Sequence, residues 1–213
     1  MKRLLERWFG SGDATALRAA RWVVVDCETS GLDPARDRLL AMGAVAVRGG
    51  RIELGESFSA VLRQDTASDP ANIQVHGIGG DAQRGGRPAA EALREFSRFL
   101  GAGLPVAFHA PFDAEVLRRA MSQVAGLQPP GGWLDLAQLA PALYPGAGRA
   151  RRALDDWLAE FGIASPGRHD ALADAYATAQ LLLVLLAEAA RQGAGTVARL
   201  RRLERDARWV APR

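Results

Sequence analysis

The chain has 213 residues, of which 48% are hydrophobic, and this is sufficient for one domain with its own core. Its formal net charge of +3 allows a polyanionic partner without requiring one. The single cysteine, Cys27, excludes an internal disulfide and a zinc site with several cysteines. The longest apolar run, Leu181 to Ala187, is too short for a membrane span, and the N-terminus lacks a signal-peptide pattern. We therefore expect a soluble, cytoplasmic protein with no membrane partner.

In chain order, the first half of the sequence predicts an N-terminal arm and three strands. Residues 1–20 are expected to form a loose arm or a short helix. Apolar and β-branched stretches then predict strands at residues 22–27, 39–48 and 51–62. Gly49-Gly50, between the last two strands, is typical of a hairpin turn. Residues 70–87 contain many Gly and Asp residues and predict an irregular loop.

The second half of the sequence predicts helices that alternate with strands. We expect a helix at residues 88–100, a strand at 104–108, a helix at 113–124, a short strand at 133–136 and helices near 151–161 and 170–190. Three strands followed by this alternation predict an α/β domain over residues 21–190, with helices flanking a mixed sheet of about five strands. Residues 191–213 would form an arginine-rich C-terminal helix or tail.

Two acidic residues, Asp26 and Glu28, lie at the end of the first predicted strand. Side chains alternate along a strand, so both acids project from one face while Cys27 points to the other. Neighbouring carboxylates repel each other unless a cation lies between them, and an all-oxygen ligand set favours Mg²⁺ or Mn²⁺. Taken alone, the pair could equally be solvated acids at a strand end.

Two further acids are candidate ligands in predicted helices. Asp113 lies at the start of a helix that follows a strand, where a capping role is the simpler interpretation. Asp174 shares the apolar face of the helix over residues 170–190, where a charge is costly unless it is paired or binds an ion. Asp174 is therefore the stronger candidate of the two.

His169 precedes Asp174 by five residues, at the loop or first turn that leads into the same helix. A neutral imidazole at this position could accept a proton from a water molecule near neutral pH. The alternative is a histidine that caps the helix or packs against it. Asp170, the next residue, is better explained as a favourable charge in the first turn of the helix.

The order and context of these segments resemble the three motifs of the DEDDh exonucleases, a family that includes the proofreading epsilon subunit of bacterial DNA polymerase III. The matching segments are Asp26-x-Glu28, Phe112-Asp113 and His169-x-Ala171-x-x-Asp174, and the similarity covers about residues 20–190. Val75-His76-Gly77-Ile78 resembles a family element that lies against the terminal nucleotide. Thr29, Gly31 and Leu32 match the segment that holds the 3′ end. The second motif departs from the family pattern, because Phe108-His109 stand where the family often has His-Asn.

The resemblance implies a ribonuclease-H-like fold and two-metal hydrolysis of DNA from the 3′ end, with RNA as the alternative substrate. It implies that two Mg²⁺ or Mn²⁺ ions are held by Asp26, Glu28, Asp113 and Asp174, and that His169 is the general base. The implied substrate-binding residues are Thr29, Gly31, Leu32, His76, His109 and Phe112. The products would be nucleoside 5′-monophosphates, and the partners would be single-stranded or frayed 3′ ends and a polymerase or repair protein.

Other functions remain open from the sequence. The same fold could serve as a catalytically silent nucleic-acid-binding or scaffold protein, or as a short-RNA exonuclease. A small-molecule phosphatase would fit the ligands but not the segment for the terminal nucleotide. The arginine-rich stretch at residues 197–209 has helical spacing, and we expect it to pack on the domain as an amphipathic helix.

Overall fold

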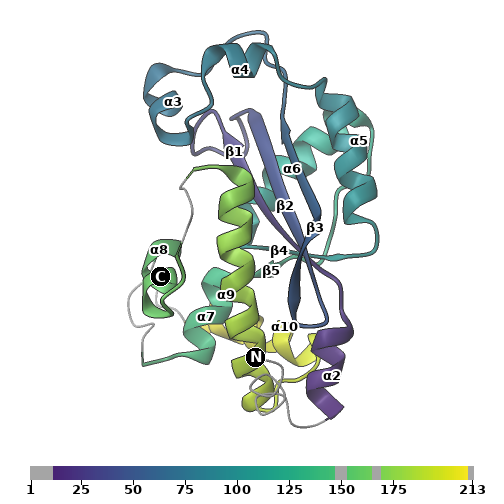
Figure 1. Cartoon of the computed structure of the whole chain (residues 1–213), viewed down its shortest axis with the longest axis vertical. Coiled ribbons are helices and arrows are strands. Elements are labelled where there is room, and N and C mark those ends of the chain that lie inside the picture. The colour runs from purple at the N-terminus through teal and green to yellow at the C-terminus, as the bar shows by residue number, and fades with distance from the viewer. Residues whose placement is uncertain (1–11, 147–152, 165–168, 211–213) are drawn as a thin grey trace.

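The computed structural model describes residues 12–146, 153–164 and 169–210, and its framework is a five-stranded mixed sheet (Figure 1). The strands lie in the order β3-β2-β1-β4-β5. β1 pairs antiparallel with β2 and parallel with β4. The strands are β1 (Trp22–Thr29), β2 (Leu39–Arg48), β3 (Arg51–Val61), β4 (Leu104–Ala107) and β5 (Leu134–Asp135). The predicted mixed sheet is therefore confirmed.

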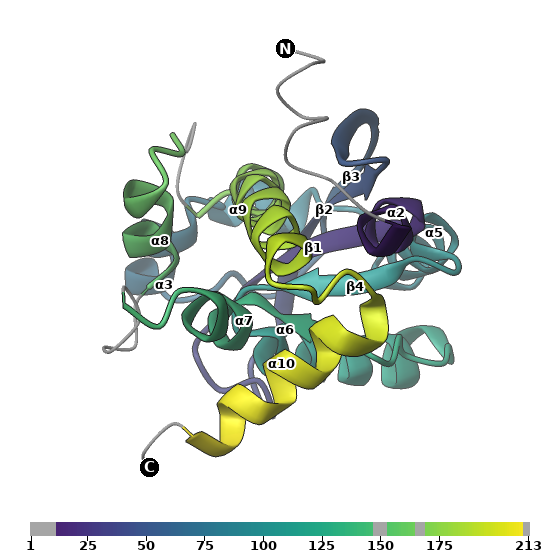
Figure 2. The same cartoon turned by 90° about the horizontal axis from the view of Figure 1, so that it is seen from below.

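Helices cover both faces of the sheet because β1 is apolar on both sides. Trp22 and Val24 contribute to a core with α7, α8 and α9, whereas Val23 and Val25 contribute to a second core with α5 and α6. Figures 1 and 2 show α9 crossing one face of the sheet. The helices that form these layers are α5 (Ala89–Leu100), α6 (Ala110–Ala120), α7 (Leu136–Leu143), α8 (Leu154–Glu160) and α9 (Ala171–Arg191).

One prediction about local structure was wrong, and one helix was not predicted. Residues 70–87 are not an irregular loop but contain two short helices, α3 (Pro70–His76) and α4 (Gly80–Arg84). The glycines that suggested a loop stand at the helix ends, and Gly77 closes α3 in the left-handed conformation. The sequence analysis also missed α7, whose first residue directly follows β5 and which contains Pro141. A proline within so short a segment obscures its helical pattern.

The remaining helices agree with the expected pattern, within small shifts of their boundaries. The helix expected at residues 113–124 begins earlier, as α6, and continues into a wider π-helical turn, η1 (Met121–Ala125). The helix expected at 151–161 is present as α8, and residues 151 and 152 lie outside the described residues. Although α9 is long and apolar enough to cross a membrane, most of it is buried inside the protein. It is a core helix of this fold.

The two ends of the chain contribute further helices. The described part of the expected N-terminal arm contains α2 (Gly12–Ala19), while residues 1–11 lie outside the described residues. The C-terminal arginine-rich segment forms α10 (Val197–Val210), which packs against α7 and β5 (Figure 2). Its buried Leu200 belongs to the same core as α9. The predicted helix at residues 197–209 is therefore confirmed, and it packs on the domain.

Candidate active site

The acids of β1 lie where the central strand leaves the regular sheet. Asp26 pairs with Gly43 of β2, and the register shifts between Glu28 and Thr29. Irregularities of this kind occur next to active sites because they redirect side chains at the end of a strand. Cys27 packs on the opposite side, against the core that contains α5 and α6. The predicted alternation of Asp26 and Glu28 with Cys27 is therefore present.

Glu28, His169 and Asp174 come together at this end of the sheet. Potential ligand atoms of the three side chains all lie within 4.8 Å of one another, and no other such group was found among the described residues. Glu28 and Asp174 are only 9% and 4% exposed, whereas His169 is exposed. Because a histidine and two carboxylates converge from β1 and α9, the arrangement is suited to hold a divalent cation.

The start of α9 is held in place by its own side chains. Asp170 is the N-cap, and its Oδ1 accepts a hydrogen bond from the backbone N–H of Ala173 at 2.9 Å. The backbone N–H of His169 donates to Oδ2 of Asp174 at 2.8 Å. His169 has a positive φ of 62°, which is uncommon for a residue other than glycine. These contacts orient Asp174 and direct the chain before α9 towards the carboxylates.

Gly43 allows α9 to approach the sheet closely enough for this arrangement, and the sequence analysis did not identify it. A Cβ at Gly43 would overlap the backbone of Ala171 and Leu172, at the first turn of α9. Gly43 also pairs with Asp26 in the β1–β2 register. The first turn of α9 therefore packs directly on the backbone of β2, next to the strand that carries Asp26 and Glu28.

Asp113 occupies a buried position on the first turn of α6, on the side of Cys27. Its carboxylate accepts hydrogen bonds from the thiol and the backbone N–H of Cys27. Burial, together with the charge of Asp135, raises the pKa of Asp113 to about 7, and the hydrogen bonds offset only part of this effect. The pKa of the Cys27 thiol is also raised well above its usual value, mainly by burial and next by the charge of Asp113. Asp113 lies outside the group formed by Glu28, His169 and Asp174.

Asp135 is a buried acid that supports the segment before α6, and the sequence analysis did not identify it. Its Oδ1 accepts hydrogen bonds from the backbone N–H groups of His109 and Ala137, both at 3.0 Å. His109 has a positive φ of 63°, and its exposed ring contacts Phe108 edge to face. Phe112, by contrast, is partly buried against the core of α5 and α6. The structure thus leaves the His109 ring, rather than Phe112, accessible to a ligand.

The segment expected to hold the 3′ end follows Glu28 immediately. The Thr29 hydroxyl donates a hydrogen bond to the Gly31 carbonyl at 2.6 Å, which closes a tight turn after β1. The side chain that follows, Leu32, is 93% exposed. Leu32 is therefore accessible from solution.

His76 is buried, with 4% exposure, and does not present its ring to solvent. Its Nδ1 accepts a hydrogen bond from the Ile78 N–H, so Nε2 carries the proton and donates to the Ser68 hydroxyl at 3.1 Å. Gln83 also binds Ser68: the Ser68 N–H donates to Oε1 of Gln83, and Nε2 of Gln83 donates to the Ser68 hydroxyl. Burial lowers the pKa of His76, and the nearby charge of His169 adds to this effect. The neighbouring Val75 is exposed, at 56%.

Comparison with known proteins identifies the class of the chain. The RNase_T family model, which describes an exonuclease, matches residues 23–182. The match spans the sheet and the acids of β1, α6 and α9. The chain therefore belongs to this exonuclease family.

Its relatives include bacterial proteins that are named as DNA polymerase III or its epsilon subunit. A DNA polymerase III PolC-type protein of Thermotoga maritima is 32% identical over 81% of this chain but only 12% of its own length. A DNA polymerase III subunit epsilon-like protein of Rhodobacter capsulatus is 35% identical, over 81% of this chain and 24% of its own length. The epsilon subunit of Treponema pallidum is 30% identical, over 78% of this chain and 77% of its own length. The chain thus spans a small part of the first two relatives.

Solved structures confirm the ribonuclease-H-like fold. Escherichia coli Exonuclease I in complex with a dT13 oligonucleotide has a TM-score of 0.67 and 22% identity, and the match covers 81% of this chain and 42% of that one. The cell-death related nuclease CRN-4 also has a TM-score of 0.67, with 15% identity, over 79% of this chain and 64% of that one. At these identities the likeness establishes the fold alone.

The packing at Gly43 predicts that Gly43→Ala displaces α9 from the sheet. The added methyl group would meet backbone atoms that cannot rotate away, so we expect a loss of about 1–3 kcal/mol in the free energy of unfolding. Nuclease activity should fall about 10²-fold, because a displacement of about 1 Å misplaces Asp174 and His169. Urea unfolding and hydrolysis of a single strand measure the two effects.

Gly55→Ala is the matched control for this prediction, because a Cβ at Gly55 meets no atom within 4 Å. Its stability and activity should remain close to those of the wild type. Full activity of Gly43→Ala would show that the approach of α9 to β2 does not position the site.

The raised pKa of Asp113 predicts an unusual dependence of stability on pH in the metal-free protein. Its folded-state pKa of about 7 lies above the usual 3.8, so its contribution to stability is full below the usual pKa and is lost as pH rises through about 7. Asp113→Asn should remove this loss. The free energy of unfolding of the variant, relative to that of the wild type, should therefore rise by roughly 2–3 kcal/mol between pH 5 and pH 8. Urea unfolding in a chelator at both pH values measures it, and an equal advantage at both would contradict the assignment.

Proposed function

We propose that this chain is a DEDDh-type 3′–5′ exonuclease that releases nucleoside 5′-monophosphates from single-stranded or frayed 3′ ends of DNA. The observation that carries the proposal is the convergence of Glu28, His169 and Asp174 within 4.8 Å at the end of β1. The match to an exonuclease family over residues 23–182 supports the reaction class. We assign the nuclease unit to residues 21–190, and α10 packs on it as an additional helix.

The donor atoms at the site fit divalent cations such as Mg²⁺ or Mn²⁺. Asp26, Glu28 and Asp174 would hold one ion, and Asp26 with Asp113, directly or through water, would hold a second. Carboxylate oxygens are the ligands that these hard cations prefer, and the Asp174 and Glu28 side chains are buried beside His169. When bound, such ions would polarise the phosphodiester and offset its negative charge.

His169 would act as the general base for the attacking water. Its backbone is held by the N–H bond to Asp174, while its exposed side chain faces solvent and the incoming strand. An imidazole titrates close to neutral pH, so it can accept a proton from water during the reaction and release it afterwards. The role of His169 would thus be to move a proton next to the scissile phosphate, while the carboxylates would hold the cations that bind the phosphate.

The terminal nucleotide would lie between the turn after β1 and helix α3. Leu32 and Val75 are two of the large hydrophobic side chains that the described structure leaves exposed, and both belong to segments expected to contact the 3′ end. Apolar side chains can stack on any base, which suits an enzyme that removes successive nucleotides. His76 would support Val75 from within the protein, through Ser68 and Ile78, rather than contact the nucleotide with its ring.

The relatives favour DNA and a place beside a polymerase. Those described above are named as parts of DNA polymerase III, so we propose that the chain serves the 3′ ends that replication or repair produces. RNA remains the alternative substrate. A replicative polymerase or repair protein would then be the partner that delivers the 3′ end.

The direction of cutting provides the test of this function. A 5′-labelled single strand incubated with Mg²⁺ or Mn²⁺ should yield a ladder that shortens from the 3′ side, with nucleoside 5′-monophosphates as products. A covalently closed circle should resist, because the proposed pocket takes a free end. Ca²⁺ should support the reaction poorly, because its longer and looser coordination misplaces the attacking water. Cleavage of the circle would identify an endonuclease, and binding without cleavage would identify a silent binding protein.

Asp174→Asn should abolish this hydrolysis while the fold is retained, because the amide removes a charged ligand without changing the shape of the side chain. Asp206→Asn, which removes an exposed acid of α10 that is paired with Arg202, is the matched control and should retain activity. The rate of 3′-end shortening with saturating Mn²⁺ measures both variants. If Asp174→Asn kept more than about a tenth of wild-type activity, Asp174 would not be a metal ligand.

The proposed base predicts a change in the pH–rate profile. His169→Gln should lower kcat about 10²-fold or more with little change in KM, because a general base acts mainly in the transition state. In the wild type, log kcat should rise with pH through the imidazole range, and the variant should lose this limb. A variant that kept the wild-type profile would assign His169 to a structural role.

A further inference from the structure

The loop between β1 and β2, residues 30–38, is closed around the carboxylate of Asp37. The Ser30 hydroxyl donates to Oδ1 of Asp37 at 3.1 Å, and the Asp33 N–H donates to Oδ2 at 2.8 Å. The chain passes so close to this carboxylate that a Cβ at Gly31 would lie 2.5 Å from Oδ2. Leu32 is part of this loop, so Asp37 determines the local conformation of the segment proposed to hold the 3′ end.

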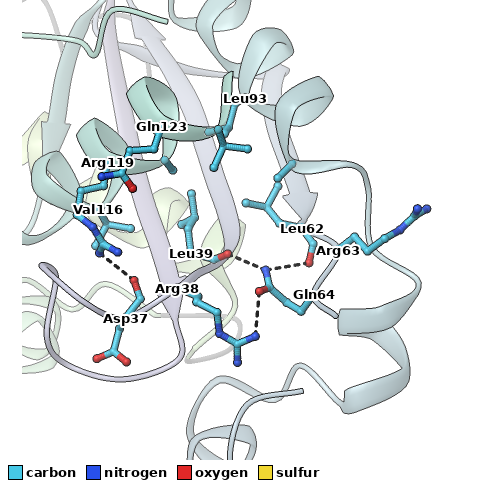
Figure 3. Close-up of a pocket in the computed structure, with 13 residues that line it drawn as sticks. Asp37, Arg38, Leu39, Leu62, Arg63, Gln64, Leu93, Val116, Arg119 and Gln123 are labelled. Carbon is cyan, nitrogen blue, oxygen red and sulfur yellow. Dashed lines mark hydrogen bonds between the residues drawn. The ribbon is translucent and has the colours of Figure 1, made fainter. Parts of the chain in front are cut away.

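A second interaction fastens the loop to the rest of the protein. Nη1 of Arg119, near the end of α6, donates hydrogen bonds to the carbonyls of Pro34 at 2.6 Å and Asp37 at 3.0 Å. Nη2 of the same side chain donates to the Arg36 carbonyl at 3.3 Å. Figure 3 shows the Arg119 side chain directed from its helix towards Asp37. One planar guanidinium therefore binds three carbonyls of the loop, which a lysine ammonium cannot do in the same geometry.

A pocket lies beside the hydrogen bonds between Arg119 and loop 30–38, so few packing contacts hold the loop there. A pocket of about 260 Å³ opens between the end of the loop and helices α5 and α6, and Asp37, Leu39, Val116 and Arg119 contribute to its lining (Figure 3). Because this volume is not filled by side chains, close packing contributes little on this side of the loop. The hydrogen bonds of Arg119 cross the boundary between the loop and α6.

The helix that carries Arg119 also carries Asp113, the proposed ligand of the second cation. A helix is rigid over this distance, so α6 connects the metal site to the loop that contains Leu32. We propose that Arg119 is a positioning residue, which holds loop 30–38 at a fixed distance from the carboxylates so that the terminal nucleotide is aligned with them. This inference rests on the proposed exonuclease function.

Arg119→Ala should weaken the binding of the 3′ end more than it slows the chemical step. Without the three carbonyl contacts the loop must be ordered by the substrate, and the loss of about 1.4 kcal/mol of binding energy corresponds to an about tenfold increase in KM. The kcat value should stay within about threefold of wild type, because the carboxylates and His169 are unchanged. Steady-state hydrolysis of a 5′-labelled single strand measures both constants.

Arg118→Ala provides a matched control for the loss of positive charge. Arg118 is the preceding residue of α6, is exposed, and pairs with Glu115 on its own helix rather than with the loop. Its variant should keep KM within about twofold, since a single exposed charge contributes little. Arg119→Lys retains the charge but not the planar fork, and its KM should lie between those of wild type and Arg119→Ala. If KM rose equally in Arg118→Ala and Arg119→Ala, the loss of positive charge alone would explain the increase, and the proposal would be overturned.

Hydrogen exchange tests the same role without substrate. In Arg119→Ala the amides of residues 33–38 should exchange faster than in the wild type, while those of β1 and β2 keep their protection. Unchanged exchange in the loop would overturn the proposal. If the alanine variant does not fold, Arg119→Lys is used for the same measurement. If the wild-type chain hydrolysed no nucleic acid, the proposed exonuclease function would fail, whereas the exchange result would still decide whether Arg119 fastens the loop.

Discussion

The site depends on the contact between the backbone of β2 and the first turn of α9. At Gly43 the two backbones approach so closely that a methyl group has no room, and this places Ala171 directly over the strand next to β1. His169 and Asp174 lie on either side of that contact in the sequence. Because a paired strand and a capped helix are both stiff, the separation between Glu28 and Asp174 is determined by backbone packing rather than by adjustable side chains.

This packing gathers several acids in a small, largely buried region. Asp174, Glu28 and Asp113 are buried or nearly so, and burial raises the pKa of Asp113 to about 7. The Cys27 thiol and backbone N–H groups contribute hydrogen bonds, but Asp135 adds a like charge. A cation relieves desolvation and repulsion together, so its binding energy would also stabilise the fold. An ion bound as proposed would therefore recover stability that is lost by gathering these acids.

Features with a local or periodic signal could be predicted from the sequence. The alternation along β1 placed Asp26 and Glu28 on the face opposite Cys27, and the apolar stripe of α9 indicated that Asp174 is buried. Gly43, Asp135 and Arg119 have no such signal, because each acts on a segment distant in sequence, and one glycine in a strand resembles any other. The inward orientation of His76 likewise depends on Ser68 and Gln83, whose hydrogen bonds form only in the folded chain.

The two sides of the site differ in how their residues are held, and the difference matches the roles proposed for them. The acids lie on a strand and on two helices, where their positions are rigid, as the proposed cation site requires. Loop 30–38 is the segment proposed to hold the terminal nucleotide. Its shape is maintained from within by Asp37 and from outside by Arg119 and by Asn72, whose side-chain amide donates to the Ser30 carbonyl. His169 differs again, because its backbone is fixed while its side chain remains exposed. In the proposed role of general base, this access to solvent would let His169 release its proton after each turnover.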